Sequence, residues 1–278
     1  MEILSPAKIN LFLHVTGKRP DGYHNLFMLM CCITLYDTIL MTFGVEKISV
    51  SCTDPNVPQD ETNLAHRAAS LFFGALNKYE GVKISIDKKI PVAAGLGGGS
   101  SNAAAVLDGL NRYYDYPFSR DALMSMGLSL GADVPFFIFR KPAIATGIGE
   151  QLEVYEGLKP FKVLLVFPGF NVSTEDVYKN FNLRLTRCKK KIIELSIKDN
   201  DFDATFMCND LEAVTALKYP DIKRIKTLLL NLGAEGALMS GSGPSVFGLF
   251  SDPECTEKAK QVLSSNSRWS VYIADMII

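Results

Sequence analysis

Alternation of apolar and polar residues marks two segments in the first third of the chain. One covers residues 8–15, KINLFLHV, and the other covers residues 82–90, VKISIDKKI. A period of two predicts β-strands, because successive side chains of a strand point to opposite faces. The polar side chains of Lys8 and Asn10 are therefore expected on one face of the first strand, where they form a candidate site.

Apolar residues at helical spacing predict helices over residues 63–76 and 121–130. Ser119 is a suitable N-cap for the second helix and Gly131 follows its end, which leaves Asp133 in a turn before Pro135. Beyond about residue 150 the pattern predicts a strand over 163–167, helices near 176–181, 211–217 and 222–232, a hairpin of 235–240 with 245–250, a helix over 253–263 and a terminal strand. This mixture predicts the α+β class, with a domain seam expected around Gly147.

Glycines are concentrated in residues 91–104, PVAAGLGGGSSNAA, between a predicted strand and a predicted helix. The helix has apolar residues at Ala103, Val106, Leu107, Leu110 and Tyr114. Glycine adopts positive φ and lets a ligand approach the backbone closely, and a helix N-terminus presents free amides to an anion. The strand, glycine loop and helix therefore predict a phosphate-binding site.

Two other phosphate-binding loops fit this segment poorly. A Walker loop needs a lysine after its last glycine, but Gly99 is followed by Ser100 and Ser101. A dinucleotide-binding loop needs GxGxxG and an acidic residue at the end of the next strand, about 20 residues further on. The glycines fit that spacing loosely, and Asp115 directly follows a predicted helix with no strand between.

Composition is that of an ordinary globular protein. The chain has 278 residues, of which 47% are hydrophobic, enough for one large or two medium domains. Its 29 basic and 30 acidic residues give a formal net charge of -1, so neither nucleic acid nor an anionic membrane is an expected partner. We interpret the basic cluster at 184–191 as a solvated surface. Neither a leader segment nor an apolar run of about 18 residues is recognised, so a cytoplasmic location is expected.

The cysteines and histidines form no metal-binding pattern. The six cysteines, at positions 31, 32, 52, 188, 208 and 255, form neither CxxC pairs nor a compact framework, and we interpret them as reduced thiols. The three histidines, His14, His24 and His66, are too far apart for a zinc motif. A serine-type triad is not indicated either, because no serine lies in a GxSxG elbow with a plausible partner.

Residues 91–101 resemble the second motif, P-x-x-x-G-L-G-S/G-S-S/G, of the superfamily of galactokinase, homoserine kinase, mevalonate kinase and phosphomevalonate kinase. SPAKINLFLHVTGKRPDGYHNL at 5–26 and MSGSGPSVFG at 239–248 resemble the first and third motifs of one branch. With GADVPFF at 131–137, the set resembles the branch whose acceptor is 4-diphosphocytidyl-2-C-methyl-D-erythritol, in non-mevalonate isoprenoid biosynthesis. The resemblance covers nearly the whole chain.

This resemblance implies a two-domain α+β kinase fold. Residues 1–152 would form a ribosomal-protein-S5-domain-2-like domain for ATP binding and catalysis, and residues 153–278 a ferredoxin-like α/β sandwich on the substrate side. The implied reaction is direct in-line transfer from ATP to the 2-hydroxyl of the acceptor, with Mg²⁺ bridging the phosphates. A monomer or weak homodimer without a nucleic-acid or membrane partner is expected.

The resemblance also implies residue roles. Asp133 would accept the proton of the acceptor hydroxyl, and Lys8 would keep that carboxylate ionised and orient the hydroxyl. The nucleotide would be bound by the glycine loop together with two outlying residues: Pro91, Val92, Ala93, Ala94, Gly95, Leu96, Gly97, Gly98, Gly99, Ser100, Ser101, Asn63 and Lys88. The cytidine diphosphate-linked substrate would be bound by Asn10, Tyr23, His24, Thr174, Tyr178, Gly241, Ser242 and Gly243. No protein ligand of the metal is assigned.

Structural roles stay open for several of these residues. Asp133 could instead stabilise a turn or cap a helix, and Tyr23 with His24 could simply close a hairpin. The GSGPS turn at 241–245 could need only positive φ, and Asn63 and Lys88 could be surface residues. Tyr178 departs from the family, whose members carry phenylalanine there, so its hydroxyl needs a partner or solvent.

Three other functions also stay open. A nicotinamide-dependent oxidoreductase would use the same glycine loop, and a non-catalytic nucleotide sensor would keep the loop without needing Asp133 and Lys8. A kinase for another small alcohol, such as homoserine or a mevalonate derivative, is the nearest alternative. The DGYH segment at 21–24 distinguishes it, because those acceptors carry no cytosine to stack on an aromatic ring.

Overall fold

A computed structural model describes residues 1–183 and 202–278. The chain forms two compact units, each assembled from separate stretches of sequence. The first unit comprises Met1–Ala7, Tyr36–Val92 and Gly97–Arg140, and the second comprises Lys8–Leu35, Ala93–Leu96 and Lys141–Ile278. The sequence predicted a single division between residues 152 and 153, whereas each of these units combines several separate stretches. The functional division at that position stays a prediction. Cys188 and the basic cluster at 184–191 lie outside the described residues.

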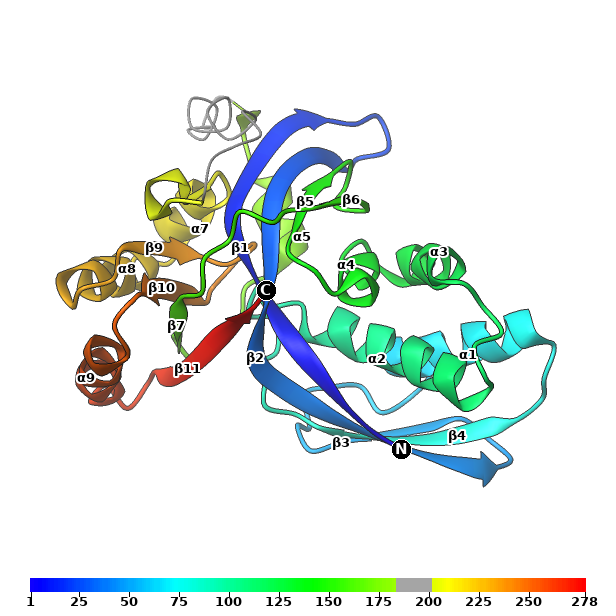
Figure 1. The fold of residues 1–278 in the computed structure, drawn as a ribbon. Helices are drawn as coiled ribbons and strands as arrows, with labels where there is room; N and C mark the ends of the chain where they lie inside the picture. Colours follow the sequence, from blue (N-terminus) through cyan, green and yellow to red (C-terminus); the bar gives the residue numbers. More distant parts are fainter. Residues whose placement is uncertain (184–201) are drawn as a thin grey trace. The chain divides into compact units, whose positions relative to one another are not determined.

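In the first unit, helices cover one face of a small sheet (Figure 1). Strand β4 (Gly81–Asp87) pairs antiparallel with β2 (His24–Val45) and parallel with β3 (Ser49–Cys52). Helix α1 (Leu64–Leu76) connects the two parallel strands and packs on α2 (Gly98–Tyr113). The alternating segment at 82–90 and the helical pattern at 63–76 are thus confirmed as a strand and a helix.

Two shorter helices complete the first unit. Helix α3 (Arg120–Leu130) begins after the predicted N-cap, because the Ser119 hydroxyl accepts the Ala122 amide at 3.2 Å. Helix α4 (Val134–Phe139) was not predicted, because its residues VPFFIF have no polar face that would give a helical period. A Cβ on Gly127 would lie 2.9 Å from Val134 Cγ1, so glycine in α3 lets α4 pack closely against it.

The second unit contains an antiparallel four-stranded sheet with the order β11-β7-β10-β9. Helices α8 (Asp221–Asn231) and α9 (Pro253–Ser264) pack on it (Figure 1). The strands are β7 (Lys162–Phe167), β9 (Gly236–Met239), β10 (Val246–Phe250) and β11 (Ser270–Ile277). The predicted strand, hairpin, helices and terminal strand of this region are confirmed.

The rest of the second unit surrounds strand β1 (Glu2–Lys18), whose first residues belong to the first unit. β1 pairs with β2 and, in parallel, with the short strand β8 (Cys208–Asn209). Residues around Gly147, expected at a domain seam, form the turn between β5 (Ala143–Thr146) and β6 (Gln151–Val154) inside this unit. Among the residues that the structure describes, the remaining short helices of this unit are α5 (Thr174–Lys179), η2 (Ala204–Phe206) and α7 (Glu212–Lys218).

The cysteines do not all match their interpretation. Cys31, Cys32, Cys52 and Cys255 are free thiols, and burial raises the pKa of Cys31 and Cys52. Cys208 is disulfide-bonded, so reading every cysteine as a reduced thiol was wrong for this one. Within the described ranges, no helix has the length and apolar character needed to cross a membrane.

Candidate functional site

Lys8 and Asn10 lie on the same face of β1, as the alternating pattern predicts. The Lys8 ammonium donates a hydrogen bond to Asn10 Oδ1 at 2.7 Å. Both residues are buried, with exposed fractions of 5% and 0%. A buried ammonium is stable only where polar or charged groups surround it, which makes this face of β1 a built polar site.

The turn at 240–245 lies against the same residues. A Cβ placed on Gly241 would come within 3.4 Å of Lys8 Nζ and 3.5 Å of Asn10 Oδ1. Gly241 has a φ of +56° and Gly243 a φ of +86°, a backbone region that disfavours side chains. The structural reading of GSGPS as a positive-φ turn is therefore confirmed, and the turn also adjoins the predicted acceptor site.

Part of the glycine loop packs on this turn. The Ser240 hydroxyl donates to the Gly95 carbonyl at 3.0 Å, and the Ser245 amide donates to the Ala94 carbonyl at 3.3 Å. A Cβ on Gly95 would lie 2.1 Å from the Ser240 carbonyl oxygen, so only glycine fits there. The Leu96 carbonyl accepts the Lys8 amide at 2.9 Å. Residues 93–96 are thus held between β1 and the turn within the second unit.

Thr174 and Ser242, both predicted on the substrate side, are brought together. Their hydroxyls are 2.8 Å apart, and Thr174 is the first residue of α5. The preceding Ser173 caps that helix by accepting the Asp176 amide at 3.2 Å. Because Ser173 provides the N-cap, the Thr174 hydroxyl is not needed to cap the helix and contacts Ser242 in the turn.

His24 and Tyr178 also meet, although they are 154 positions apart in the printed sequence (178 minus 24). Their rings stack at a centroid distance of 5.2 Å, and Phe181 meets the imidazole edge-on at 6.1 Å. Burial, with a smaller contribution from the charge of Lys18, lowers the pKa of His24. A neutral imidazole on an aromatic ring can donate or accept a hydrogen bond at the edge of a base.

Tyr23 behaves differently from its neighbour. Its side chain is 58% exposed, and its carbonyl accepts the Arg19 amide at 2.8 Å in the turn between β1 and β2. Gly22 has a φ of +89° in the same turn. Tyr23 therefore does help to close the hairpin between β1 and β2, and the neighbouring His24 is buried.

Asn63, predicted near the nucleotide, is the N-cap of α1. Its Oδ1 accepts the Ala65 amide at 2.8 Å, and its Nδ2 donates to the Pro58 carbonyl at 2.6 Å. The residue is only 6% exposed, so it is not the surface residue that was the alternative. These contacts hold the loop before α1 to the start of the helix.

Lys88, the other predicted outlying residue, forms a buried ion pair. Its ammonium lies 2.6 Å from Asp37 Oδ2 and donates to the Ile90 carbonyl at 2.7 Å. The other Asp37 oxygen accepts the amides of Lys89 and Ile90, each at 2.8 Å. This pair fixes the chain where it enters the glycine loop. Sequence reasoning missed Asp37, although a lone carboxylate in the apolar run 33–41 was a usable signal.

The glycine loop ends at the N-terminus of α2. Gly97 is the N-cap with a φ of +70° and provides no side-chain cap. A Cβ on Gly98 would lie 2.9 Å from Lys88 Nζ, so a larger residue in the first turn would displace the lysine end from its present position. The Ser5 hydroxyl donates to Asn102 Oδ1 at 2.8 Å and lies 2.7 Å from the Ser101 hydroxyl. An uncapped helix start next to flexible glycines suits an anion.

Asp133 occupies the N-cap position of α4, but its side chain makes no capping hydrogen bond with that helix. The capping alternative is therefore not what the structure shows. The residue is half-buried and belongs to the first unit, whereas Lys8 belongs to the second. Their pairing stays a prediction.

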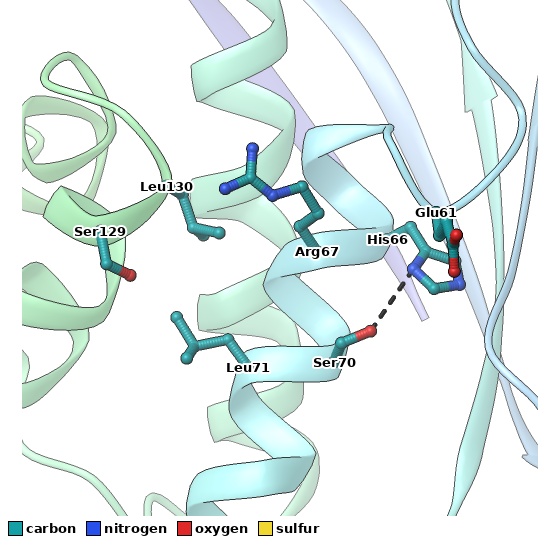
Figure 2. Close-up of a pocket in the computed structure, with 7 residues that line it drawn as sticks. All are labelled: Glu61, His66, Arg67, Ser70, Leu71, Ser129 and Leu130. Atoms are coloured by element: carbon teal, nitrogen blue, oxygen red, sulfur yellow. Dashed lines mark hydrogen bonds between the residues drawn. The ribbon is translucent and has the colours of Figure 1, made fainter.

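A pocket of about 450 Å³ lies beside α1 and the end of α3 (Figure 2). Its lining consists of Glu61, His66, Arg67, Ser70, Leu71, Ser129 and Leu130. His66 Nδ1 and the Ser70 hydroxyl are 3.4 Å apart. None of these residues was a predicted site residue, and Glu61 and Arg67 are solvent-exposed charges of opposite sign.

No group of three or more histidine, cysteine, aspartate or glutamate side chains in the described parts of the chain could hold a metal ion. Mg²⁺ in phosphoryl-transfer enzymes is bound largely by substrate phosphates and water, with one or two carboxylates. The residues present are therefore compatible with a magnesium ion that arrives on a nucleotide.

Comparison with known proteins places this geometry in a family. Residues 63–141 match the family model described as GHMP kinases N terminal domain, and residues 191–268 match GHMP kinases C terminal. A homoserine kinase from Cytophaga hutchinsonii, 19% identical, has the same fold with a TM-score of 0.77 over 99% of this chain and 94% of that one. The predicted α+β fold class is confirmed.

Proteins with higher sequence identity to this chain identify the branch of the family to which it belongs. A protein of Syntrophotalea carbinolica named 4-diphosphocytidyl-2-C-methyl-D-erythritol kinase is 48% identical over 99% of this chain and 98% of its own length. One of Geobacter sp. with the same name is 46% identical over 97% and 96%. A crystal structure of 4-(cytidine 5'-diphospho)-2C-methyl-D-erythritol kinase is 34% identical, with a TM-score of 0.82 over 100% of both chains. The chain therefore belongs to the GHMP kinases and, within them, to the family of 4-diphosphocytidyl-2-C-methyl-D-erythritol kinases.

Proposed function

We propose that this protein phosphorylates the 2-hydroxyl of 4-diphosphocytidyl-2-C-methyl-D-erythritol with ATP, in non-mevalonate isoprenoid biosynthesis. The observation that carries the proposal is the sequence identity of 48%, over 99% of the chain, to a relative named for this kinase activity. The paired acceptor-side residues of the second unit agree with it.

On the donor side, the backbone of residues 91–101 and the uncapped start of α2 bind the triphosphate. ATP arrives with Mg²⁺, which neutralises charge on the phosphates. Asn63 and Lys88 contribute through the framework: one fixes the start of α1 and the other fixes the entry to the loop.

At the reacting hydroxyl, Asp133 accepts the proton while the γ-phosphoryl group passes to the oxygen and ADP leaves. Lys8, held by Asn10 at 2.7 Å, presents a positive charge to the hydroxyl and to the transferring group. The proton ends on the Asp133 carboxylate, and the products are ADP and the phosphorylated acceptor.

On the acceptor side, the stacked pair of His24 and Tyr178 binds the cytosine ring. Stacking favours any base, and hydrogen bonds from the imidazole edge supply the choice of cytosine. Tyr23 adds an exposed aromatic ring at the same hairpin. Asn10, Thr174 and the turn at 241–243 bind the diphosphate.

The proposal also includes location and partners. The protein is cytoplasmic, it is a monomer or weak homodimer, and it has no nucleic-acid or membrane partner. A net charge of -1 supports the lack of polyanionic partners.

A coupled assay of ADP release tests the proposal with three acceptors: 4-diphosphocytidyl-2-C-methyl-D-erythritol, homoserine and mevalonate. Turnover is expected only with the first. Turnover with either of the other two alone would overturn the substrate assignment. Binding of NADH without binding of an ATP analogue would favour an oxidoreductase, and ATP binding without any turnover would favour a sensor.

A further inference from the structure

Four consecutive carbonyl groups, from Met239 at the end of β9 to Ser242 in the turn, accept hydrogen bonds from other residues of the second unit. Asn209 Nδ2 donates to the carbonyls of Met239 and Gly241, at 2.8 and 2.7 Å. The Gly243 amide donates to the Ser240 carbonyl at 2.9 Å, and the Thr215 hydroxyl shares its one proton between the carbonyls of Ser242 at 3.2 Å and Leu211 at 3.3 Å. Each carbonyl oxygen of this stretch thus points into the protein.

In two of these peptide units, those that end in the Gly241 and Ser242 amides, the N–H group points the other way. In a trans peptide the N–H lies opposite the C=O, so drawing in the Gly241 carbonyl turns the Ser242 N–H outward. In the described parts of the chain, backbone acceptors engage the amides of Ser240, Gly243 and Ser245, whereas those of Gly241 and Ser242 have none. Successive free amides in a turn with positive φ form an anion-binding concavity.

The surroundings of this turn favour an anion as well. The Lys8 ammonium lies 3.4 Å from the position that a Gly241 Cβ would occupy, and the hydroxyls of Thr174 and Ser242 meet at 2.8 Å. Donors and positive charge therefore gather where the turn exposes its amides.

Asn209 is itself fixed on β1 by its neighbour. Asp210 Oδ2 accepts the Val15 amide at 3.0 Å and lies 2.5 Å from His14 Nδ1, and the Asp210 amide donates to the Leu13 carbonyl at 3.0 Å. Asn209 Oδ1 accepts the Leu211 amide at 2.9 Å, so its amide group can have only one orientation. The strand that carries Lys8 and Asn10 and the turn that carries Gly241 are thus held in register by residues 209–210.

We propose that Asn209 is a positioning residue for the acceptor diphosphate: its two N–H groups draw back the carbonyls of Met239 and Gly241 so that the turn presents amides, not carbonyl oxygens, to the phosphates. Thr215 contacts the Ser242 carbonyl and so helps to keep that carbonyl oxygen away from the phosphates. The inference rests on the proposed function, because it deepens the acceptor side of that site.

The test is the steady-state kinetics of Asn209→Asp. Aspartate keeps the size of the side chain and the acceptor for Leu211, but it cannot donate to either carbonyl. We expect the KM for the cytidine diphosphate-linked acceptor to rise about tenfold, equivalent to about two neutral hydrogen bonds, with the KM for ATP unchanged within about twofold. Thr215→Val, which loses one hydroxyl, is expected to raise the acceptor KM about threefold.

Leu263→Ala in α9 is the matched control, because Leu263 is a buried core residue of the same unit and makes no hydrogen bond to the turn. A purely structural defect lowers the active fraction, and so kcat, while both KM values stay at wild type. An unchanged acceptor KM in Asn209→Asp and Thr215→Val would overturn the inference. Wild-type protein inactive on this acceptor would instead overturn the proposed function itself.

Discussion

The predicted nucleotide side and the predicted acceptor side use their polar side chains in opposite ways. In the first unit, Asn63 and Lys88 are committed to framework contacts: one caps α1 and the other neutralises the buried Asp37. In the second unit, the side chains of Thr174 and Ser242, and those of His24 and Tyr178, pair with one another around a glycine turn. Under the proposed function, the nucleotide would therefore be bound mainly by the backbone, and the acceptor by these side chains together with the backbone of the glycine turn.

This difference follows from the chemistry of the two ligands. A triphosphate presents many equivalent oxygens, which backbone amides of a glycine loop can contact without side chains. A cytosine ring presents a face, on which aromatic side chains can stack, and an edge with its own pattern of hydrogen-bond donors and acceptors. Substitutions on the two sides should therefore affect different quantities.

The largest expected effect is on turnover, from Asp133→Asn. Removing a general base costs about 10²- to 10⁴-fold in rate, and asparagine keeps the shape. We expect kcat to fall by that order while an ATP analogue binds as in the wild type. ADP release and analogue binding measure the two quantities. Unchanged turnover would contradict the assignment of Asp133 as the base.

The next effect is on stability, from Asp37→Asn. The change leaves the Lys88 ammonium buried without its counter-charge, and breaking a buried pair in this way costs about 3–5 kcal/mol. The free energy of unfolding from denaturant titration measures the loss. Asp275→Asn is the control, because its pair with Lys162 is 2.6 Å long but half-exposed and is expected to contribute about 0–1 kcal/mol. Equal losses in the two variants would contradict the framework role of Asp37.

On the acceptor side, Tyr178→Ala removes the ring that stacks on His24. Base stacking contributes about 1–3 kcal/mol per base, so the acceptor KM should rise about tenfold or more with the KM for ATP unchanged. Tyr178→Phe keeps the ring and is expected to retain the wild-type KM. Equal effects of alanine and phenylalanine would show that the hydroxyl, not the ring, matters.

The smallest expected effect is the pH dependence that His24 contributes to stability. Burial lowers the pKa of His24 in the folded state, so the unfolded chain binds the proton more readily. The free energy of unfolding is therefore insensitive to this ring well above its ordinary pKa of about 6.5 and decreases as pH falls below it. Denaturant titrations between about pH 8 and pH 5 should show a shallower decrease for His24→Gln. A steeper one would contradict the sign of the shift.

Local patterns in the sequence were enough to predict most of the helices and strands and the shared face of Lys8 and Asn10. Alternation along residues 8–15 was enough to place Lys8 and Asn10 on one face, since side-chain direction in a strand depends only on position, and Ser119 was a readable N-cap. The helix α4 escaped prediction because its six residues are buried nearly all round and leave no period. The motif resemblance supplied the family, which the comparisons confirmed.

Only the tertiary structure decided which distant groups meet. Asp37 finds Lys88, His24 stacks on Tyr178, and Asn209 reaches the carbonyls of Met239 and Gly241, in each case across many residues of chain. A single sequence records the residue types but not these pairings, because burial of a charge or a free amide becomes favourable only once the partner is in place. The sequence therefore determined the local elements and the chemistry available, whereas the packing determined which polar groups serve the framework and which remain to bind a ligand.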